Sequence, residues 1–518
     1  MQLAVVVGFV VSVVVIARIV YLRWTEDVSS LRLPPGPKPI PLLGNVHQLS
    51  MVSQEKTFAN WGKLYGGLVY AQLFRTPAIV INSLKAAQDL LDAKSANYSH
   101  RPRFVLLSDL MGWDCVITHM TYGERFRKHR RWIAQAFEDK DALISYRALQ
   151  RREAYVLISG LFESPGFFRA HIRRFAAAMI MEIAYGHSVT SLNDQFVHLA
   201  ERAAKETIES GGPGSMIVDF FPLLRHLPMW LPGAGFKRKA HKVRLIVRKM
   251  LDAPFEMVKT AMMHGTASPS FTATLLEEVF SRGTPTTEEE DDIKGAAGVL
   301  FGAATDTTSA VLSTFILAMT LHPDIYKKAR AEIDRVVGTV RLPDFPDRDS
   351  LPYLECVLEE VYRWNCPVPL GLPHKAAAHD QYRGYDIPGG SMIIPNIWAM
   401  TRDTQMYASP ESFIPERFQG LSREDADLHN PRNMVFGFGR RACPGRKFAD
   451  ASIWFAAANI IATVNISQPN DLSRKNADLC DLFIPGFVSH PRDFICNMTP
   501  RSRNALEMVS DMRVHTAF

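Results

Sequence analysis

The segment that decides the fold is Phe436-Gly437-Phe438-Gly439-Arg440-Arg441-Ala442-Cys443-Pro444-Gly445, followed by Arg446 and the apolar stretch KFADASIWFAAANIIATV. The apolar stretch predicts a helix that runs from Cys443 to about Val464. Proline directly after Cys443 places the thiol at the N-terminus of that helix, where the positive end of the helix dipole lowers a thiol pKa. Gly437 and Gly439 allow the preceding backbone to fold tightly around the sulfur.

Cys443 is therefore predicted to be a stabilised thiolate, with Arg440, Arg441 and Arg446 supplying positive charge nearby. Such a thiolate is a metal ligand or a nucleophile. No histidine-based nucleophile motif accompanies it, so the ligand role is favoured. The other five cysteines read as small buried hydrophobes, and their scattered spacing predicts neither disulfides nor a zinc site: Cys115, Cys356, Cys366, Cys480 and Cys496.

The segment resembles the haem loop of the cytochrome P-450 family, Phe-x-x-Gly-x-Arg-x-Cys-x-Gly, and matches every fixed position. The resemblance implies heme b (iron protoporphyrin IX) as cofactor, with the Cys443 thiolate as axial ligand of the iron. It also implies a mainly α fold with small β-sheets. The matching, cofactor-binding positions are Phe436, Gly439, Arg441, Cys443 and Gly445.

A second motif lies in a helix predicted over residues 287–320, which opens with Thr286-Thr287 and an acidic run. Either Thr286 with Glu289 or Thr287 with Glu290 can form a capping box there. Its many glycines and alanines keep the helix thin, as if something large must approach. The resemblance makes Asp306 and Thr307 the catalytic acid and threonine, which deliver protons and hold the oxygen being activated. Ala304 replaces a glycine that is usual in the family, which predicts less local widening of the helix.

Two further groups match the family. Glu360 and Arg363, with Arg417 from Pro415-Glu-Arg-Phe418, are expected to form a structural charge cluster. Arg130 and His374, together with Arg441, are expected to bind the haem propionates. The tryptophan that usually precedes Arg130 is replaced by Phe126, which removes one N–H donor and predicts weaker haem retention.

The remaining sequence reads as one mostly helical domain, residues 46–518, with 47% hydrophobic residues and a net charge of +6. Residues 55–82 alternate as strands do, and further short strands are expected between 376 and 395 and near the C-terminus. Helices are predicted at 84–94, 121–137, 142–160, 168–186, 193–210, 236–262, 270–282, 287–320, 323–337 and 353–364.

The N-terminus differs in composition. Residues 1–24 contain an apolar run long enough to span a bilayer, and residues 25–45 are rich in proline. We expect a retained membrane anchor followed by an extended linker, the alternative being a cleaved signal peptide. Arginines after the run predict a single-pass protein of the endoplasmic reticulum membrane whose catalytic domain faces the cytosol.

These features predict a monooxygenase that inserts one oxygen atom from O2 into a lipophilic small molecule, in fungal secondary metabolism or xenobiotic oxidation. No flavin domain is recognised, so the expected electron donor is a separate NADPH-cytochrome P-450 reductase, docked through Arg440, Arg446 and Lys447. Nothing indicates a nucleic-acid partner. Two rivals are a haem-thiolate isomerase or dehydratase and a non-catalytic haem sensor or carrier, neither of which needs Asp306 and Thr307.

Overall fold

The structure is a computed structural model that describes residues 31–50, 52–211, 217–469 and 482–515. The predicted anchor, residues 1–24, and the first part of the predicted linker lie outside this range. The described part of the linker is packed on the sheet. The Tyr70 amide donates to the Pro35 carbonyl at 3.2 Å, and the Gln72 amide donates to the Asn45 side chain at 2.8 Å.

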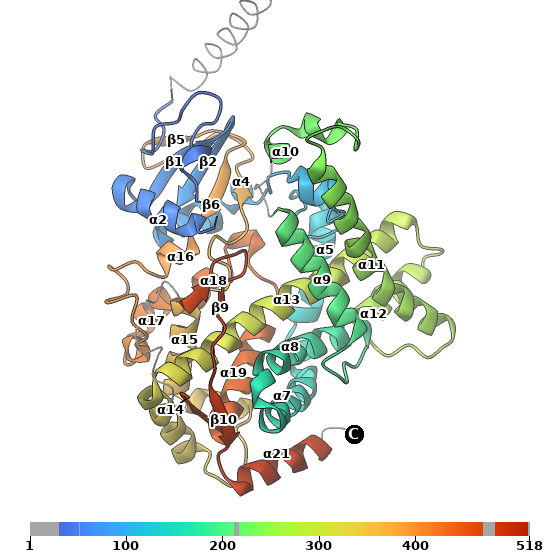
Figure 1. Cartoon of the computed structure of the whole chain (residues 1–518), viewed down its shortest axis with the longest axis vertical. Helices are drawn as coiled ribbons and strands as arrows, with labels where there is room; N and C mark the ends of the chain where they lie inside the picture. The colour runs from blue at the N-terminus through green and yellow to red at the C-terminus, as the bar shows by residue number, and fades with distance from the viewer. Residues whose placement is uncertain (1–30, 51, 212–216, 470–481, 516–518) are drawn as a thin grey trace, which may run out of the picture.

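The fold is mainly helical, and its longest helix, α13 (Thr287–Leu321), crosses the middle of the molecule. In Figure 1 the strands β1 and β2 lie at the upper left, and the helices α9, α11 and α12 lie at the right. The remaining helices are α2 (Gln54–Tyr65), α3 (Leu84–Ala87), α4 (Ser95–Tyr98), α5 (Glu124–Phe137), α6 (Lys140–Ser145), α7 (Arg147–Glu163), α8 (Phe168–Tyr185), α9 (Gln195–Ser210), α10 (Ile217–Phe220), α11 (Gly235–Met263), α12 (Phe271–Phe280), α14 (Pro323–Val336), α15 (Pro352–Trp364), α16 (Ile397–Met400), α17 (Arg423–His429), α18 (Arg432–Val435), α19 (Arg446–Thr463) and α21 (Arg503–His515).

The largest sheet has four strands in the order β1-β2-β6-β3, and the other strands form pairs: β10 with β7, β4 with β5, and β8 with β9. β1 and β2 are antiparallel, with Leu68 opposite Ile81, whereas β2 and β6 are parallel. The strands are β1 (Leu68–Leu73), β2 (Thr76–Ile81), β3 (His374–Lys375), β4 (Asp380–Tyr382), β5 (Tyr385–Ile387), β6 (Met392–Pro395), β7 (Val464–Ser467), β8 (Phe483–Ile484), β9 (His490–Pro491) and β10 (Asn497–Pro500).

Two predictions for local structure were wrong. Residues 54–65 form helix α2 rather than part of a strand, because Phe58, Ala59 and Trp61 bury one helical face. The helix predicted over 142–160 is two helices, α6 and α7, which meet at Tyr146. The strand prediction held for the rest of 55–82, where β1 and β2 lie.

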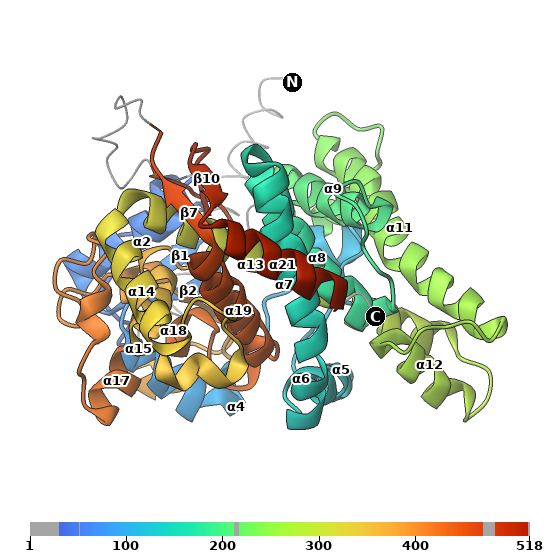
Figure 2. The same ribbon diagram turned by 90° about the horizontal axis from the view of Figure 1, so that it is seen from below.

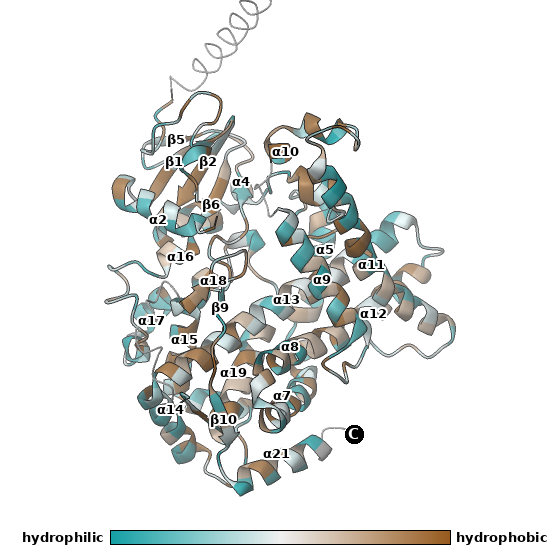
Figure 3. Ribbon diagram, viewed as in Figure 1, coloured by the Kyte–Doolittle hydropathy of each residue, from teal (hydrophilic) through white to brown (hydrophobic). Residues whose placement is uncertain are grey.

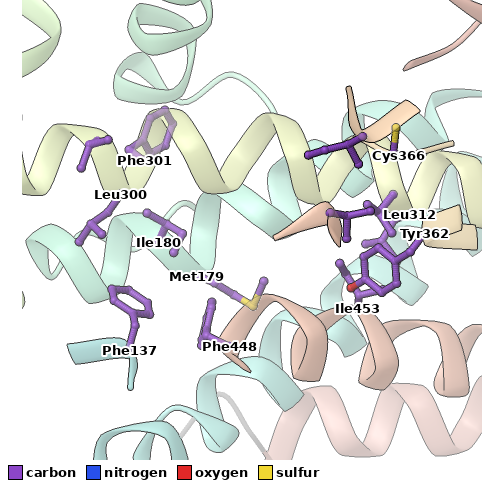
Figure 4. Packing of buried hydrophobic residues seen from close by; sticks show 14 of the residues in the cluster. Phe137, Met179, Ile180, Leu300, Phe301, Leu312, Tyr362, Cys366, Phe448 and Ile453 are labelled. Atoms are coloured by element: carbon purple, nitrogen blue, oxygen red, sulfur yellow. The ribbon is translucent and has the colours of Figure 1, made fainter. Parts of the chain in front are cut away.

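The core is built around α13, which packs against α8, α11, α12, α15 and α19. Figure 4 shows Leu300 of this helix near Ile180 of α8 and Leu312 near Ile453 of α19. Viewed from below, α13 lies among α7, α8 and α19 (Figure 2). Hydrophobic residues are more frequent in these central helices than in α17 at the edge, which is hydrophilic (Figure 3). In the described part of the chain, α13 alone is long and apolar enough to span a membrane, and it is mostly buried inside the protein.

Candidate active site

The cysteine loop runs from the end of α18 to the start of α19. It closes on itself through the Cys443 amide, which donates to the Phe436 carbonyl at 2.7 Å. Gly437 and Gly439 have positive φ angles, +75° and +54°. A Cβ atom at Gly439 would lie 2.1 Å from the Leu91 carbonyl oxygen, so this position requires glycine for space as well as for conformation.

Cys443 is half-buried and lies just before Gly445, the N-cap of α19. Burial raises the pKa of its thiol, although the Gly445 amide, Arg130 and Arg446 act to lower it. The direction is therefore opposite to the sequence-based expectation, because desolvation of the charged form outweighs the helix terminus and the arginines. A metal cation bound at the sulfur reverses this balance, since a coordinating thiol is deprotonated.

Two arginines beside the loop lack a carboxylate partner among the described residues. Arg441 donates to the carbonyls of Ser99 (2.7 Å), Ile117 (3.2 Å) and Met120 (2.6 Å), and burial lowers its pKa to about 9. Arg101 is buried and donates to the carbonyls of Leu372 and Pro373 at 2.7 and 2.9 Å. Burial and the charge of Arg441 hold the pKa of Arg101 well below its usual range.

His374 lies in the same region, at the start of β3. It is buried, and its Nδ1 atom is 2.7 Å from the Tyr98 carbonyl oxygen. Burial, Arg101 and Arg441 hold its pKa well below the usual value. Within the described residues, the Nε atom of Arg101 has no hydrogen-bond partner. A buried cation without a counter-ion is costly, so Arg101 and Arg441 favour an anionic ligand at this place, next to the His374 ring.

Arg101 was not singled out from the sequence as a site residue. It occurs in Tyr98-Ser-His-Arg-Pro102, on a segment without periodic pattern. Its importance depends on contacts with residues 271 and 272 positions away in the chain. A sequence gives no local signal for such contacts.

Arg130 differs from the other predicted propionate ligands. It lies beside the loop, where it donates to the Ala442 carbonyl at 2.5 Å, but it also pairs with Glu138 at 2.6 Å. Its charge is therefore already balanced by a carboxylate. Phe126, one turn earlier in α5, is buried under Arg441, whose guanidinium lies 3.8 Å from the ring centroid.

The small residues of α13 serve two purposes. Gly295 and Gly298 allow close packing, because a Cβ atom there would lie 1.9 Å from the Cys115 carbonyl oxygen and 2.3 Å from a Leu251 methyl carbon. Gly302 faces open space instead, with no atom within 4 Å of its hypothetical Cβ in the described structure, and Ala303 beside it is exposed. The helix is thus open at the turn that precedes Asp306 and Thr307.

Thr307 and Asp306 have separate partners. The Thr307 hydroxyl donates to the Ala303 carbonyl at 2.7 Å, within a helix that continues without interruption. Asp306 lies 3.0 Å from His490 of β9, measured from Oδ1 to Nε2. Adjacent residues of a helix point about 100° apart, so the two side chains reach different surroundings.

Glu360, Arg363 and Arg417 form a buried charge network. Arg363 makes two hydrogen bonds to the Glu360 carboxylate, at 2.6 and 2.8 Å, and Arg417 lies 3.2 Å from it. The Ile414 amide donates to the same carboxylate at 2.7 Å. These contacts join α15 to the segment that precedes the cysteine loop.

A second network, not predicted from the sequence, is centred on Arg432 at the start of α18. Its guanidinium contacts Glu355 (2.9 Å) and Glu359 (3.1 Å) of α15 and Asp450 (2.6 Å) of α19. Burial raises the pKa of Glu359 to about 7 despite Arg432. Arg432 therefore fixes the helices before and after the loop relative to α15.

Comparison with known proteins agrees with this arrangement. The chain belongs to the cytochrome P450 family, whose sequence profile, described as Cytochrome P450, matches residues 34–496. It is 44% identical to cytochrome P450 monooxygenase 136 of Postia placenta over 94% of this chain and 92% of that protein. It is 39% identical to cytochrome P450 monooxygenase claR of Ampulloclitocybe clavipes, over 94% and 90%. Tryptamine 4-monooxygenase of Psilocybe cyanescens is 35% identical, over 96% and 98%.

The chain is thus a cytochrome P450 monooxygenase, and its family implies a haem-thiolate cofactor. The residues present fit that group. A half-buried cysteine offers the iron ligand, the unpaired cations Arg101 and Arg441 offer partners for two carboxylates, and Gly302 leaves space beside α13. No cluster of three or more histidine, cysteine or acidic side chains in the described part of the chain offers an alternative metal site.

Proposed function

We propose that the protein inserts one oxygen atom from O2 into a lipophilic small molecule, with Cys443 as the axial ligand of the haem iron and electrons from a separate NADPH-dependent reductase. The observation that carries the proposal is the pair of arginines at the cysteine loop, Arg101 and Arg441, which have no carboxylate partner among the described residues. Arg101 and Arg441 would bind the haem propionates, and His374 would line the same pocket. When bound, the haem supplies the iron at which O2 is activated, and a thiolate ligand favours O–O cleavage.

The chain's own residues hold the thiol and move protons. The Gly445 amide and the closed loop fix the position of the Cys443 sulfur. Thr307 offers a hydroxyl next to the open turn of α13, and Asp306 offers a carboxylate one residue earlier. In this proposal the Thr307 hydroxyl makes a hydrogen bond on the oxygen-binding side of α13. The Asp306 carboxyl group acts as a general acid and gives its proton through water to the same side.

A lipophilic substrate is supported by the apolar and aromatic side chains of the 217–226 segment, such as Phe220 and Phe221. Phe74, which follows β1, packs against Phe220 and Phe221 at ring-centroid distances of 5.0 and 5.3 Å, so the sheet meets the 217–226 segment through aromatic rings. Relatives that include tryptamine 4-monooxygenase support a role in secondary metabolism, with xenobiotic oxidation as the alternative use of the same chemistry.

Membrane attachment is the second part of the proposal. Residues 1–24 would form the single anchor, in the endoplasmic reticulum membrane with the catalytic domain in the cytosol. Exposed apolar side chains on the described domain support this: Leu42, Leu223 and Trp230 are 71%, 83% and 79% exposed. Leu43 accepts a hydrogen bond from Phe74, whose ring contacts Phe221, so the segments that carry Leu42 and Leu223 lie next to each other.

The reductase is expected to dock beside the cysteine loop, where Arg440, Arg446 and Lys447 are exposed. Replacing all three with alanine should reduce reductase-driven turnover more than peroxide-driven turnover, because only the former needs docking. A control triple, K205A/K249A/K327A, removes the same charge from exposed positions on α9, α11 and α14. Equal losses in the two assays would contradict this part of the proposal.

The central test is the carbon monoxide difference spectrum of the dithionite-reduced protein, recorded for wild type and for Cys443→Ala. Wild type should give the red-shifted Soret band of a thiolate-ligated haem, and the variant should not. Cys356→Ala is the matched control, because this buried thiol lies in α15, away from the loop. A well-folded, haem-supplied wild type without the band would overturn the proposal.

A further inference from the structure

Asp306 of α13 has a partner from the C-terminal part of the chain. His490, in the C-terminal strand β9, places Nε2 3.0 Å from Oδ1 of Asp306. In Figure 1, β9 crosses α13 at its midpoint, and the two elements are packed together. Among the described residues, His490 is the only charged or titratable side chain within ion-pair distance of Asp306.

The segment that carries His490 is firmly anchored. The neighbouring Ser489 is buried, and its hydroxyl donates to Asn365 at 2.7 Å, while its amide donates to the Pro367 carbonyl at 2.9 Å. Asn365 in turn donates to the Thr314 hydroxyl of α13 at 3.0 Å. Because Thr314 and Asp306 lie on one helix, these hydrogen bonds fix β9 to α13 next to the His490 contact.

The contact has the chemistry of a proton relay. The two polar atoms lie 3.0 Å apart, which is within reach for a proton to pass between a carboxyl group and an imidazole. The His490 side chain is 33% exposed and that of Asp306 46%, so water can reach the ring and the second carboxylate oxygen. Imidazole is also the side chain that gains and loses a proton most readily near neutral pH.

We propose that His490 is a positioning residue that orients the Asp306 carboxyl group and resupplies its proton. Asp306 releases its proton through water toward the oxygen-binding side and becomes a carboxylate. The carboxylate takes the Nε2 proton of the His490 imidazolium, which leaves the neutral Nδ1–H tautomer, and Nε2 then regains a proton from hydronium in the solvent. No electrons move in these steps, and the net change is one proton carried from solvent to Asp306.

This inference rests on the proposed function, because Asp306 needs a proton supply only if the protein activates oxygen. The test compares His490→Gln, which keeps a hydrogen-bond donor but cannot pass a proton, with His379→Gln. His379 forms a similar pair with Asp386, at 3.3 Å, in the exposed β4–β5 hairpin, so it controls for loss of a histidine–aspartate contact. Asp306→Asn and the double variant D306N/H490Q complete a double-mutant cycle, which measures whether the two residues act together.

The readout is the reoxidation of the haem-loaded, dithionite-reduced protein by O2, followed by stopped-flow absorbance without substrate or reductase. The rate is measured from about pH 5 to 8, the range in which imidazole titrates, in H2O and in D2O. We expect wild type and H379Q to show a pH-dependent rate and a solvent isotope effect. H490Q and D306N should each lose most of both, and the double variant should lose no more than either single variant, because the two residues act as one unit.

The outcomes separate the two proposals. If wild type lacks the thiolate carbon monoxide band, the proposed function has failed. If wild type has that band but H490Q keeps the pH profile and isotope effect of H379Q, the relay is wrong and the function stands. Additive effects in the double variant would also overturn the relay. Should H490Q lose haem, D306N tests the same proton path from the α13 side.

Discussion

The guanidinium of Arg441 lies 3.8 Å from the ring centroid of Phe126, so the residue that replaces a tryptophan usual in this family stacks directly on a predicted propionate ligand. The replacement removes an N–H donor but keeps an aromatic face. Phe126 therefore retains a cation–π contact with an arginine that has no carboxylate partner in the described structure. The site compensates for part of the missing donor through this stacking.

Removing the ring should accelerate haem loss. A cation–π contact contributes about 0.5–2 kcal/mol, so Phe126→Leu should increase the haem dissociation rate about 2- to 30-fold. The measurement is haem transfer to an excess of apomyoglobin. Phe137→Leu is the matched control, because Phe137 is equally buried in the same helix but packs on Tyr146 and Phe448. Similar rates for the two variants would contradict a specific contact with Arg441.

Replacing Arg101 should change the thermal stability of the haem-free and the haem-loaded protein in opposite directions. Its buried charge lacks a counter-ion within the described residues, so Arg101→Met should stabilise the haem-free protein. The same variant should lower the haem content and the melting temperature of the loaded protein, because a propionate loses its partner. Thermal unfolding of both forms checks this. Arg103→Gln is the control, since Arg103 is exposed and pairs with Asp109. Equal destabilisation of both forms would mean that Arg101 only supports the backbone at Leu372 and Pro373.

Short-range sequence patterns predicted the position of α13 and the cysteine loop. The capping box at Thr286 and the long apolar period predicted α13 within one residue at its C-terminal end, Thr287–Leu321. The glycine spacing around Cys443 predicted a tight loop before a helix, as found. The prediction failed at residues 54–65, where a helix buries Phe58 and Trp61 against a sheet whose strands lie later in the chain.

The same limit applies to the site. Arg101, Arg432 and His490 acquire their roles from partners brought close by the fold. Arg101 and His490 lie in short segments that fit the family, but the segments alone do not reveal these partners. The pKa of Cys443 was predicted in the wrong direction because burial, the largest influence, depends on the finished tertiary structure. Local sequence patterns therefore predicted Cys443 as the ligand better than they predicted the surrounding residues that set its pKa.

The Glu360 network should make a large contribution to stability. Glu360→Gln leaves Arg363 and Arg417 near each other without their shared carboxylate, in a fully buried position. Breaking one partner of such a pair costs about 3–5 kcal/mol, so we expect a marked loss of folded, haem-containing protein. Denaturant unfolding of the haem-containing protein measures it. Glu507→Ala, which breaks an exposed pair with Arg503, should cost less than about 1 kcal/mol. A cost for E360Q as small as that of E507A would show that the cluster is dispensable.

Asp292 of α13 joins this helix to α5 and predicts how the fold responds to acid. Its buried carboxylate lies 2.5 Å from Arg125 and 3.1 Å from His129, and it also pairs with Lys128. Burial acts to raise the pKa of Asp292, but these three partners outweigh it and leave the pKa well below its usual range. Burial lowers the pKa of His129 despite the attraction of Asp292.

Both shifts destabilise the folded protein as the pH falls. The unfolded chain protonates the histidine below about pH 6.5 and the carboxylate below about pH 3.9, in each case before the folded chain does. Stability should therefore decline below about pH 6.5 and decline faster below about pH 4. His129→Asn should make the first decline shallower, because other buried histidines with lowered pKa values, such as His119 and His374, also contribute to it. Asp292→Asn should be less stable at neutral pH, with a shallower decline below about pH 4. Urea midpoints between neutral pH and pH 3.5 measure both limbs, with Asp291→Asn, which loses a half-exposed pair with Arg248, as control. A wild-type profile that stays flat down to pH 4 would contradict the role assigned to His129.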